Sequence, residues 1–335
     1  MLVDRWRTAL AVSGRGIPDG GRPVLVLVLL GILLAMVTAL FMTFDLKGSL
    51  DFALELRGRK VGGMLLVGFA VAYAAVLLHT ITNNRILTPS LMGFDALFVL
   101  IQTGAAFLFG TLAFLAIDVR LRFGIEVGIM LAFAAILYRL LFGGENRDLF
   151  LLVLAGIITG TVFSSLTALI MRVLDPNEFL TLQDLLFANF STVNRDLLLV
   201  SAAAVVVIIV ATRPLLAQLD AVAIGREHAI NLGVNHRAVV RQCLVAIAVL
   251  VSVSTALVGP VAFLGLLVSN MAYQLTGTFR HRYTPAAAGM IAAIALIGGQ
   301  FLLQEVFASV VRLSVIISFI GGIYFILLLL REAGR

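Results

Sequence analysis

Long apolar stretches without a single charged residue dominate the hydrophobic pattern of this sequence. Val24–Phe44 and Val61–Leu78 are the clearest, and Leu197–Thr212 and Leu244–Gly259 repeat the pattern further along the chain. A helix needs roughly 20 apolar residues to cross the hydrocarbon core of a bilayer. Because the backbone in lipid must satisfy its own hydrogen bonds, such stretches are forced into helices. The pattern therefore predicts an all-α, polytopic membrane protein.

The apolar stretches predict about ten transmembrane helices, near residues 24–44, 61–80, 92–109, 122–142, 149–171, 196–217, 239–258, 261–275, 285–303 and 313–330. An even number of spans places both termini on one side. Fifteen of the 24 Lys and Arg residues lie on that side, and nine lie on the other. Basic residues mark the cytoplasmic side, so both termini are predicted to be cytoplasmic. Residues 1–22 would form a cytoplasmic N-terminal arm, and 23–335 one transmembrane domain.

The composition agrees with this interpretation. The chain is 61% hydrophobic and 13% charged, whereas soluble domains are about 45–50% apolar. The net charge of +6 could indicate a nucleic-acid partner, but the orientation of the spans explains it. We therefore expect contact with membrane lipid and no binding of nucleic acid.

Several kinds of chemistry have no residues to carry them. Cys243 is the only cysteine, and the four histidines lack the spacing of a metal site. Neither lysine, Lys47 or Lys60, belongs to a phosphate-binding loop. We expect no metal, no cofactor and no catalytic activity, including ATP hydrolysis.

Ionisable residues within the predicted spans are few. Asp95 and Glu126 are expected near span ends, and Glu305 near the outer boundary. Ion-coupled carriers usually hold such groups deep in the membrane. If the chain is a transporter, its energy is therefore expected to come from another subunit.

One short segment, Ala223–Gln242, concentrates the polar residues and lies in the predicted cytoplasmic loop between spans six and seven. Glu227, Ala229 and Gly233 form the pattern E-x-A-x-x-x-G. Glu227 near a helix start suits the helix dipole, and Gly233 suits a left-handed helix end. The segment therefore predicts a short helix that contacts a soluble partner. A solvated loop that obeys the positive-inside rule is the alternative.

Small residues recur at helical spacing in the fifth predicted span. Gly156, Gly160 and Ser164 are four residues apart, and Thr159 lies beside them. Such spacing lets helices approach closely in lipid. The stripe predicts either helix packing alone or a smooth, slightly polar wall of a transport pathway.

The polar segment resembles the EAA-type loop with which permeases of ABC importers contact their ATPase. Four further stretches resemble, in family order, the ferric-siderophore and cobalamin permease family: Arg57–Gly68 (RGRKVGGMLLVG), Asn84–Gly93 (NRILTPSLMG), Gly259–Arg282 (GPVAFLGLLVSNMAYQLTGTFRHR) and Phe319–Arg331 (FIGGIYFILLLLR). The resemblance implies a type II ABC importer permease of ten helices, similar to the cobalamin permease, in the bacterial cytoplasmic (inner) membrane. It also implies a second permease, two ATPase subunits and an extracytoplasmic binding protein as partners.

The resemblance implies roles for particular residues. The ATPase-coupling loop would be 218–238, with contacts from Gly225, Arg226, Glu227, Ala229, Leu232 and Gly233. Arg57 and Lys60 would meet carboxylates of the binding protein, unless they only anchor a helix end at the interface. A cytoplasmic gate would comprise Asn83, Asn84, Arg85, Gly143 and Gly144.

Departures from the family pattern refine the expected substrate. Ser269-Asn270 stands where Pro-His is usual, and Arg85 and Ile323 replace prolines. These features are closer to the branch with two different permease chains that carries ferric siderophores, including catecholate chelates. A permease for cobalamin or haem is the first alternative. An ion-coupled secondary carrier or a membrane scaffold is the second, although broken helices at mid-membrane in repeated halves are not evident.

Overall fold

The computed structural model describes residues 21–45, 50–142, 149–305 and 312–333. Every regular element in these ranges is a helix. The ten longer helices of the described chain are α2 (Gly21–Thr43), α3 (Leu50–Thr82), α4 (Phe94–Phe109), α6 (Val119–Phe142), α7 (Leu149–Val173), α9 (Arg195–Thr212), α12 (His236–Val258), α13 (Leu264–Thr276), α14 (Thr284–Glu305) and α15 (Leu313–Ala333). Shorter helices are α5 (Thr111–Ala116), α8 (Pro176–Leu185), α10 (Leu216–Val222) and α11 (Arg226–Asn231), with single turns η1 (Pro89–Met92) and η2 (Arg213–Leu215). The predicted N-terminal arm lies almost entirely outside the described residues.

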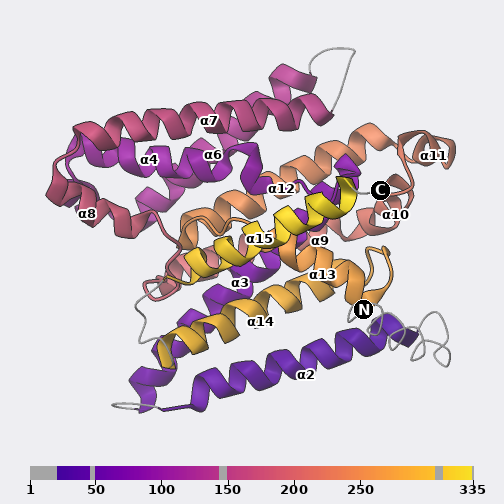
Figure 1. Cartoon of the computed structure of the whole chain (residues 1–335), viewed down its shortest axis with the longest axis horizontal. Helices are drawn as coiled ribbons and strands as arrows, with labels where there is room; N and C mark the ends of the chain where they lie inside the picture. Colours follow the sequence, from indigo (N-terminus) through magenta and orange to yellow (C-terminus); the bar gives the residue numbers. More distant parts are fainter. Residues whose placement is uncertain (1–20, 46–49, 143–148, 306–311, 334–335) are drawn as a thin grey trace.

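The long helices run in a roughly common direction, as Figure 1 shows. The short helices α10 and α11 lie at one end of the bundle, called here the α11 end, and α8 lies at the opposite α8 end. Within the described ranges, seven helices are long and apolar enough to cross a membrane, and α4 and Leu313–Leu327 are shorter apolar segments. Each predicted span coincides with one longer helix, which confirms the all-α, polytopic fold. Helix α13 has 13 residues and so covers only about 20 Å.

Helix α3 is the centre of the bundle. Inside the molecule, 72% of the most apolar stretch of α3 is buried, whereas only 6% of the corresponding stretch of the peripheral α2 is buried. One face of α3 packs with α9 and α12 in the first apolar core, which also includes residues of α4 and to which α3 contributes Tyr73 and Leu77. The other face packs with α2, α13 and α14 in a second core, to which it contributes Met64 and Val76. The two cores therefore share α3.

Small residues allow the neighbours of α3 to approach its backbone. A Cβ atom added to Gly68 would lie 3.1 Å from the Ala293 nitrogen and 3.3 Å from the Ala292 carbonyl carbon, both on α14. Such distances are tighter than ordinary contacts, so α3 and α14 touch through their backbones. Close packing through small residues is how helices associate where lipid provides no hydrophobic drive.

The chain between α3 and α4 enters the bundle without forming a helix. After the turn at Asn83, only the single turn η1 is regular before α4 begins at Phe94. Gly93 lies against Gly156 and Gly160 of α7, which are about 10–17 Å along the axis from the first residue of α7. Helix α4 therefore begins inside the bundle. Asp95 lies in its first turn, as expected of a residue near a span end, but this end is inside the bundle and not at its surface. The apolar run that begins near residue 92 carries no information on depth.

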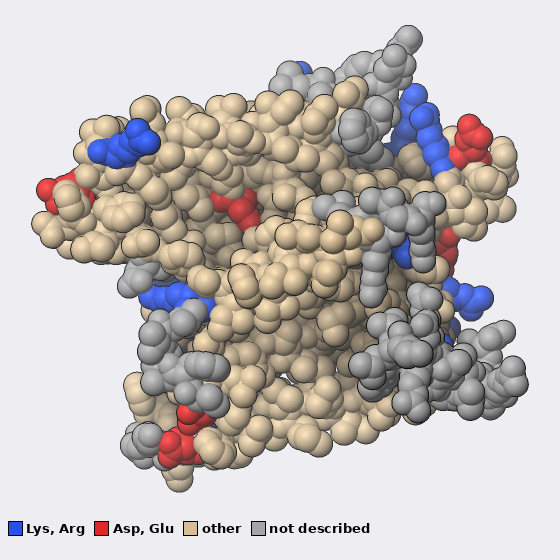
Figure 2. All heavy atoms as spheres, viewed as in Figure 1, with Lys and Arg blue, Asp and Glu red and all other residues tan. Residues whose placement is uncertain are grey.

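Charged side chains gather at the two ends of the molecule, and the middle is almost uniformly uncharged apart from one small acidic area (Figure 2). Many large apolar side chains of α2, α7 and α9 are exposed on the outside of the bundle, among them Met36, Leu169 and Val207. An uncharged apolar belt between charged ends is the surface expected of a chain that crosses a bilayer.

Candidate functional site

The polar segment forms a short helix with a defined end. Helix α11 follows Gly225, whose φ is +124°. At its other end Gly233 has φ +81°. The Gly233 N–H donates to the Ile230 carbonyl (2.9 Å), and the Val234 N–H donates to the Ala229 carbonyl (3.0 Å). These two bonds form a Schellman cap, so the predicted left-handed helix end at Gly233 is present.

Helix α11 and its flanks expose large aliphatic side chains. Ile224, Ile230 and Leu232 are 63%, 51% and 67% exposed. Ala229 is instead fully buried, in the core that also contains Val239 of α12. The expectation that Ala229 belongs to a partner-contact face was therefore wrong. A six-residue helix is too short for its inward face to be predicted from spacing.

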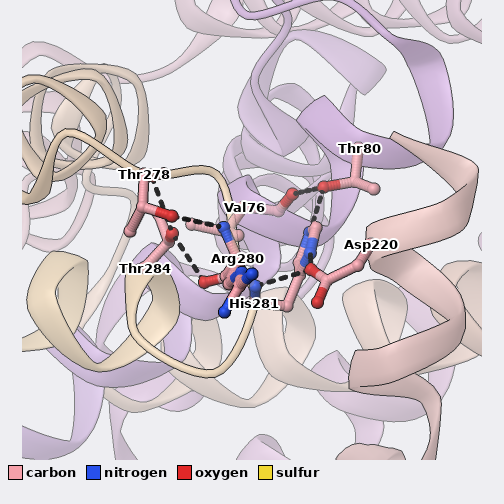
Figure 3. A network of polar contacts seen from close by, with 7 residues as sticks. All are labelled: Val76, Thr80, Asp220, Thr278, Arg280, His281 and Thr284. Carbon is pink, nitrogen blue, oxygen red and sulfur yellow. Dashed lines mark hydrogen bonds and ion pairs between the residues drawn. The ribbon is translucent and has the colours of Figure 1, made fainter. Parts of the chain in front are cut away.

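A hydrogen-bonded clasp connects α10 to two other elements (Figure 3). His281, in the loop between α13 and α14, has its backbone N–H 2.8 Å and its ring Nδ1 2.7 Å from Asp220 Oδ1 of α10. The other ring nitrogen, Nε2, lies 2.6 Å from the Thr80 hydroxyl of α3. Thr80 also donates to the Val76 carbonyl at 2.9 Å. We call Thr80, Asp220 and His281 the clasp.

Two opposing influences act on the pKa of the clasp histidine. The His281 side chain is 2% exposed, while that of Asp220 is 40% exposed. Burial lowers the pKa of the His281 ring below its ordinary value of 6.5, and the Asp220 carboxylate partly opposes this shift. Because a carboxylate can only accept, Nδ1 donates to Asp220, and the ring acts as a hydrogen-bonded link between α10 and α3.

The predicted gate residues form the turn that ends α3. Asn83 adopts a left-handed conformation with φ +49°, and the Asn84 side chain accepts from the Ile86 N–H at 2.9 Å. The Arg85 guanidinium stacks over Phe279 at 4.4 Å, and its backbone carbonyl accepts from Asn270 at 3.1 Å. The turn is thus attached to α13 and to the loop beyond it. The other predicted gate residues, Gly143 and Gly144, lie outside the described residues.

A cavity of 590 Å³ joins the turn to the polar segment. Its lining includes Asn83, Asn84, Gly225 and Arg226, together with residues of the first turns of α12. The structure therefore brings the predicted gate and the predicted coupling segment around one space at the α11 end.

The predicted docking pair lies near the α8 end of α3. Arg57 donates to the carbonyls of Phe41 and Phe44, both at 2.6 Å, and to that of Asp45 at 3.2 Å. A cation that satisfies the last carbonyls of a helix stabilises its end, so Arg57 fastens α2 to α3. This geometry favours the anchoring alternative for Arg57, whereas Lys60, which is half-buried, makes no such contact in the described residues.

The small-residue stripe on α7 packs against the start of α4. A Cβ atom at Gly156 would lie 2.9 Å from the Met92 Cα atom, and one at Gly160 would lie 3.0 Å from the Gly93 Cα atom. Thr159 and Ser164 donate to carbonyls of their own helix. Packing thus accounts for both glycines, whereas Ser164 also lines a cavity with Thr167 and Asp95.

Comparison with known proteins identifies the family. The sequence matches the FecCD transport family over residues 24–331. The chain belongs to the FecCD transport family. The resemblance to ferric-siderophore and cobalamin permeases predicted this membership, which is thereby confirmed. The chain is accordingly a multi-pass protein of the bacterial cytoplasmic (inner) membrane.

Two curated relatives and one solved structure are similar to this FecCD chain over most of its length. The petrobactin import system permease protein YclO of Bacillus subtilis is 47% identical and covers 88% of this chain and 93% of its own. The petrobactin import system permease protein FatC of Bacillus anthracis is 34% identical, and the match covers 80% of this chain and 76% of FatC. A metal-chelate type ABC transporter solved in an inward-facing conformation is 19% identical and has a TM-score of 0.78. The superposition covers 92% of this chain and 99% of the other. That last likeness shows the fold.

Sequence reasoning did not find two groups of this FecCD chain. Asp220 and His281 are 61 residues apart, so no local pattern links them as members of the clasp. Asp95 and Thr167 meet at one cavity only because α4 begins deep inside the bundle. The deep start of α4 was signalled only by Pro89, which disfavours a helix at the residue before it.

Proposed function

We propose that this chain is a transmembrane subunit of a bacterial ABC importer that passes a ferric siderophore through the cytoplasmic membrane. The observation that carries the proposal is the 47% identity, over nearly the full length of both chains, with a petrobactin import permease. The second curated relative has the same named role. The chain itself is non-catalytic, and ATP hydrolysis takes place on two partner ATPase subunits.

The α11 end is the proposed cytoplasmic end, with both termini on that side. The basic residues of Ala223–Gln242 support this orientation through the positive-inside rule. The exposed aliphatic side chains of Ile224, Ile230 and Leu232 then lie in water unless a partner covers them. We assign this coupling face to the ATPase, because aliphatic side chains projecting from a rigid, capped helix suit a groove on a soluble protein.

The clasp gives the coupling face a mechanical connection. Helix α10, which carries Asp220, is separated from α11 only by residues 223–225. Through His281 and Thr80 it is hydrogen-bonded to the loop before α14 and to the central α3. A displacement of α11 by the ATPase would therefore reach the core of the bundle through α10.

Two further partners complete the proposed importer. A binding protein delivers the loaded siderophore at the α8 end, where Lys60 is the remaining candidate for a contact with its carboxylates. A second permease of different sequence completes the pathway. Departures at Ser269, Asn270 and Ile323 support the choice of a different chain.

Uptake is expected to follow ATP and not ion gradients. Proteoliposomes that contain the complete importer and enclosed ATP should accumulate iron from a loaded binding protein, and uptake should fall at least tenfold without ATP. Collapse of the proton and sodium gradients should have no effect. Uptake that follows the gradients would favour the ion-coupled carrier instead, and competition by excess cobalamin or haem would favour the alternative substrates.

The two permease positions are expected to hold different chains. Two differently tagged copies of this chain would be expressed together with the neighbouring transport genes, and active complexes would be isolated by one tag. The second tag should be absent from complexes that hydrolyse ATP in response to loaded binding protein. Recovery of both tags in equal amounts from active complexes would show a homodimer.

A further inference from the structure

A cavity of 450 Å³ lies between α4, α7 and the segment before α13. Its lining is mostly apolar, with polar side chains at five positions: Thr88, Ser90, Asp95, Ser164 and Thr167. Ligand pockets of about 300–1,000 Å³ usually combine an apolar lining with a few placed polar groups. The cavity has the size to hold one arm of a chelate.

Irregular backbone borders this cavity on two sides. One is the non-helical approach to α4 described above, and the other leads from α12 to α13, where Phe263 has φ +61°. Backbone of this kind is tolerated at membrane depth only where protein buries it or where it lines a cavity. Discontinuous helices at mid-membrane are also a recurrent way to build transport sites.

Two oxygen atoms at the cavity have no partner among the described residues. They are Asp95 Oδ2 and Thr167 Oγ1, and the Thr167 side chain is only 5% exposed. The Ser90 side chain lies beside the Asp95 carboxyl, whose Oδ2 atom has no hydrogen-bond partner in the described part of the chain. An aspartate inside a membrane helix costs about 2.5–3.5 kcal/mol, so an unpartnered one is expected to have a function.

The unsatisfied groups match one ligand chemistry. Asp95 Oδ2 accepts hydrogen bonds. Ser164 can also accept, because it already donates its proton to the Gly160 carbonyl at 2.9 Å. The unpartnered Thr167 hydroxyl can accept as well as donate. An ammonium group has three donors and no acceptor. None of the described residues that line the cavity is a lysine, arginine or histidine, so the chain itself supplies no cation there.

We infer that this cavity receives a protonated amine of the passing chelate and that Asp95 is its specificity-determining residue. The inference rests on the proposed function and adds the charge of the substrate to it. Asp95 also lies in the first turn of α4, where the helix dipole favours a negative charge. The carboxylate is thereby held ready in the absence of substrate and exchanges no covalent bond with it.

The test compares two forms of one ferric chelate, one with free amines and one with the same amines acetylated, because acetylation removes the positive charge and leaves the iron site unchanged. The complete importer in proteoliposomes receives each form on saturating binding protein.

Asp95→Asn should lower uptake of the amine form about tenfold and change uptake of the acetylated form less than twofold. Thr167→Val should change uptake in the same direction by about threefold. The matched control is Asp118→Asn, which alters an exposed aspartate away from the cavity and should affect neither form.

Three results would overturn the inference. Equal losses for both forms would make Asp95 a structural residue, and unchanged uptake of both would leave it without a role. Failure of the Asp95→Asn chain to assemble with the second permease would assign the carboxylate to a subunit contact, provided that Thr167→Val then shows no preference between the forms. Failure of the proposed function is distinguishable, because the unaltered importer would then take up neither form with ATP.

Discussion

Replacing Gly233 with valine is expected to abolish transport while leaving membrane insertion intact. Gly233 has φ +81°, and a Cβ atom there would meet no neighbour within 4 Å. The penalty is therefore purely conformational, on the order of 1–3 kcal/mol for a residue held in a sparsely populated region. Relief of that strain would open the Schellman cap and move the coupling face. We expect uptake and ATPase stimulation by loaded binding protein to fall at least tenfold.

Gly233→Asn is the matched control, because asparagine tolerates the left-handed conformation. It should keep most of the activity that valine removes. Leu232→Asp tests the coupling face separately from the cap, since the Leu232 side chain is 67% exposed. This variant should lose the ATPase during purification. If the valine variant transports normally and retains the ATPase, α11 has no coupling role.

Breaking the clasp is expected to uncouple ATP hydrolysis from uptake. His281→Ala removes the ring contacts to Asp220 and Thr80, so that α10 loses its side-chain link to α3. Helix α10 would then move without pulling on α3. We expect uptake per ATP hydrolysed to fall about tenfold, while assembly with the ATPase is retained.

A double-mutant cycle tests whether Asp220 and His281 act together. Asp220→Ala should reduce uptake as strongly as His281→Ala, and the double variant should be no worse than either, because residues in one network are not additive. Thr278→Val is the control in the same loop, since it removes only a 3.3 Å contact from the Arg280 N–H. Additive losses, or a loss in the control of equal size, would argue against a clasp that transmits movement.

The spans could be predicted from sequence because lipid leaves the backbone no alternative to a helix. The cap at Gly233 could also be predicted, because only a few residue types tolerate a left-handed helix end. The depth at which α4 begins could not be predicted from the sequence. The sequence around Asp95 is apolar both before and after it, and the position of α4 depends on the fit of Gly93 against α7, which is a tertiary contact.

The contacts that particular side chains make could not be predicted from the sequence either. Arg57 fits a docking motif by spacing, yet its guanidinium is occupied by the terminal carbonyls of α2. Ala229 fits the coupling pattern, yet it packs inward in the core with residues of α12. The sequence does not indicate which backbone carbonyls a side chain will contact or which face of a short helix packs inward. These two assignments therefore needed the structure.

The central position of α3 limits how this subunit can change shape. A domain hinges where its core divides into two parts that touch weakly, but here both apolar cores contain the same helix. Sliding along α3 is blocked as well, because α14 meets it backbone to backbone at Gly68. The subunit is therefore expected to tilt as a rigid body, so that the opening and closing of the importer take place at the seam between its two permeases.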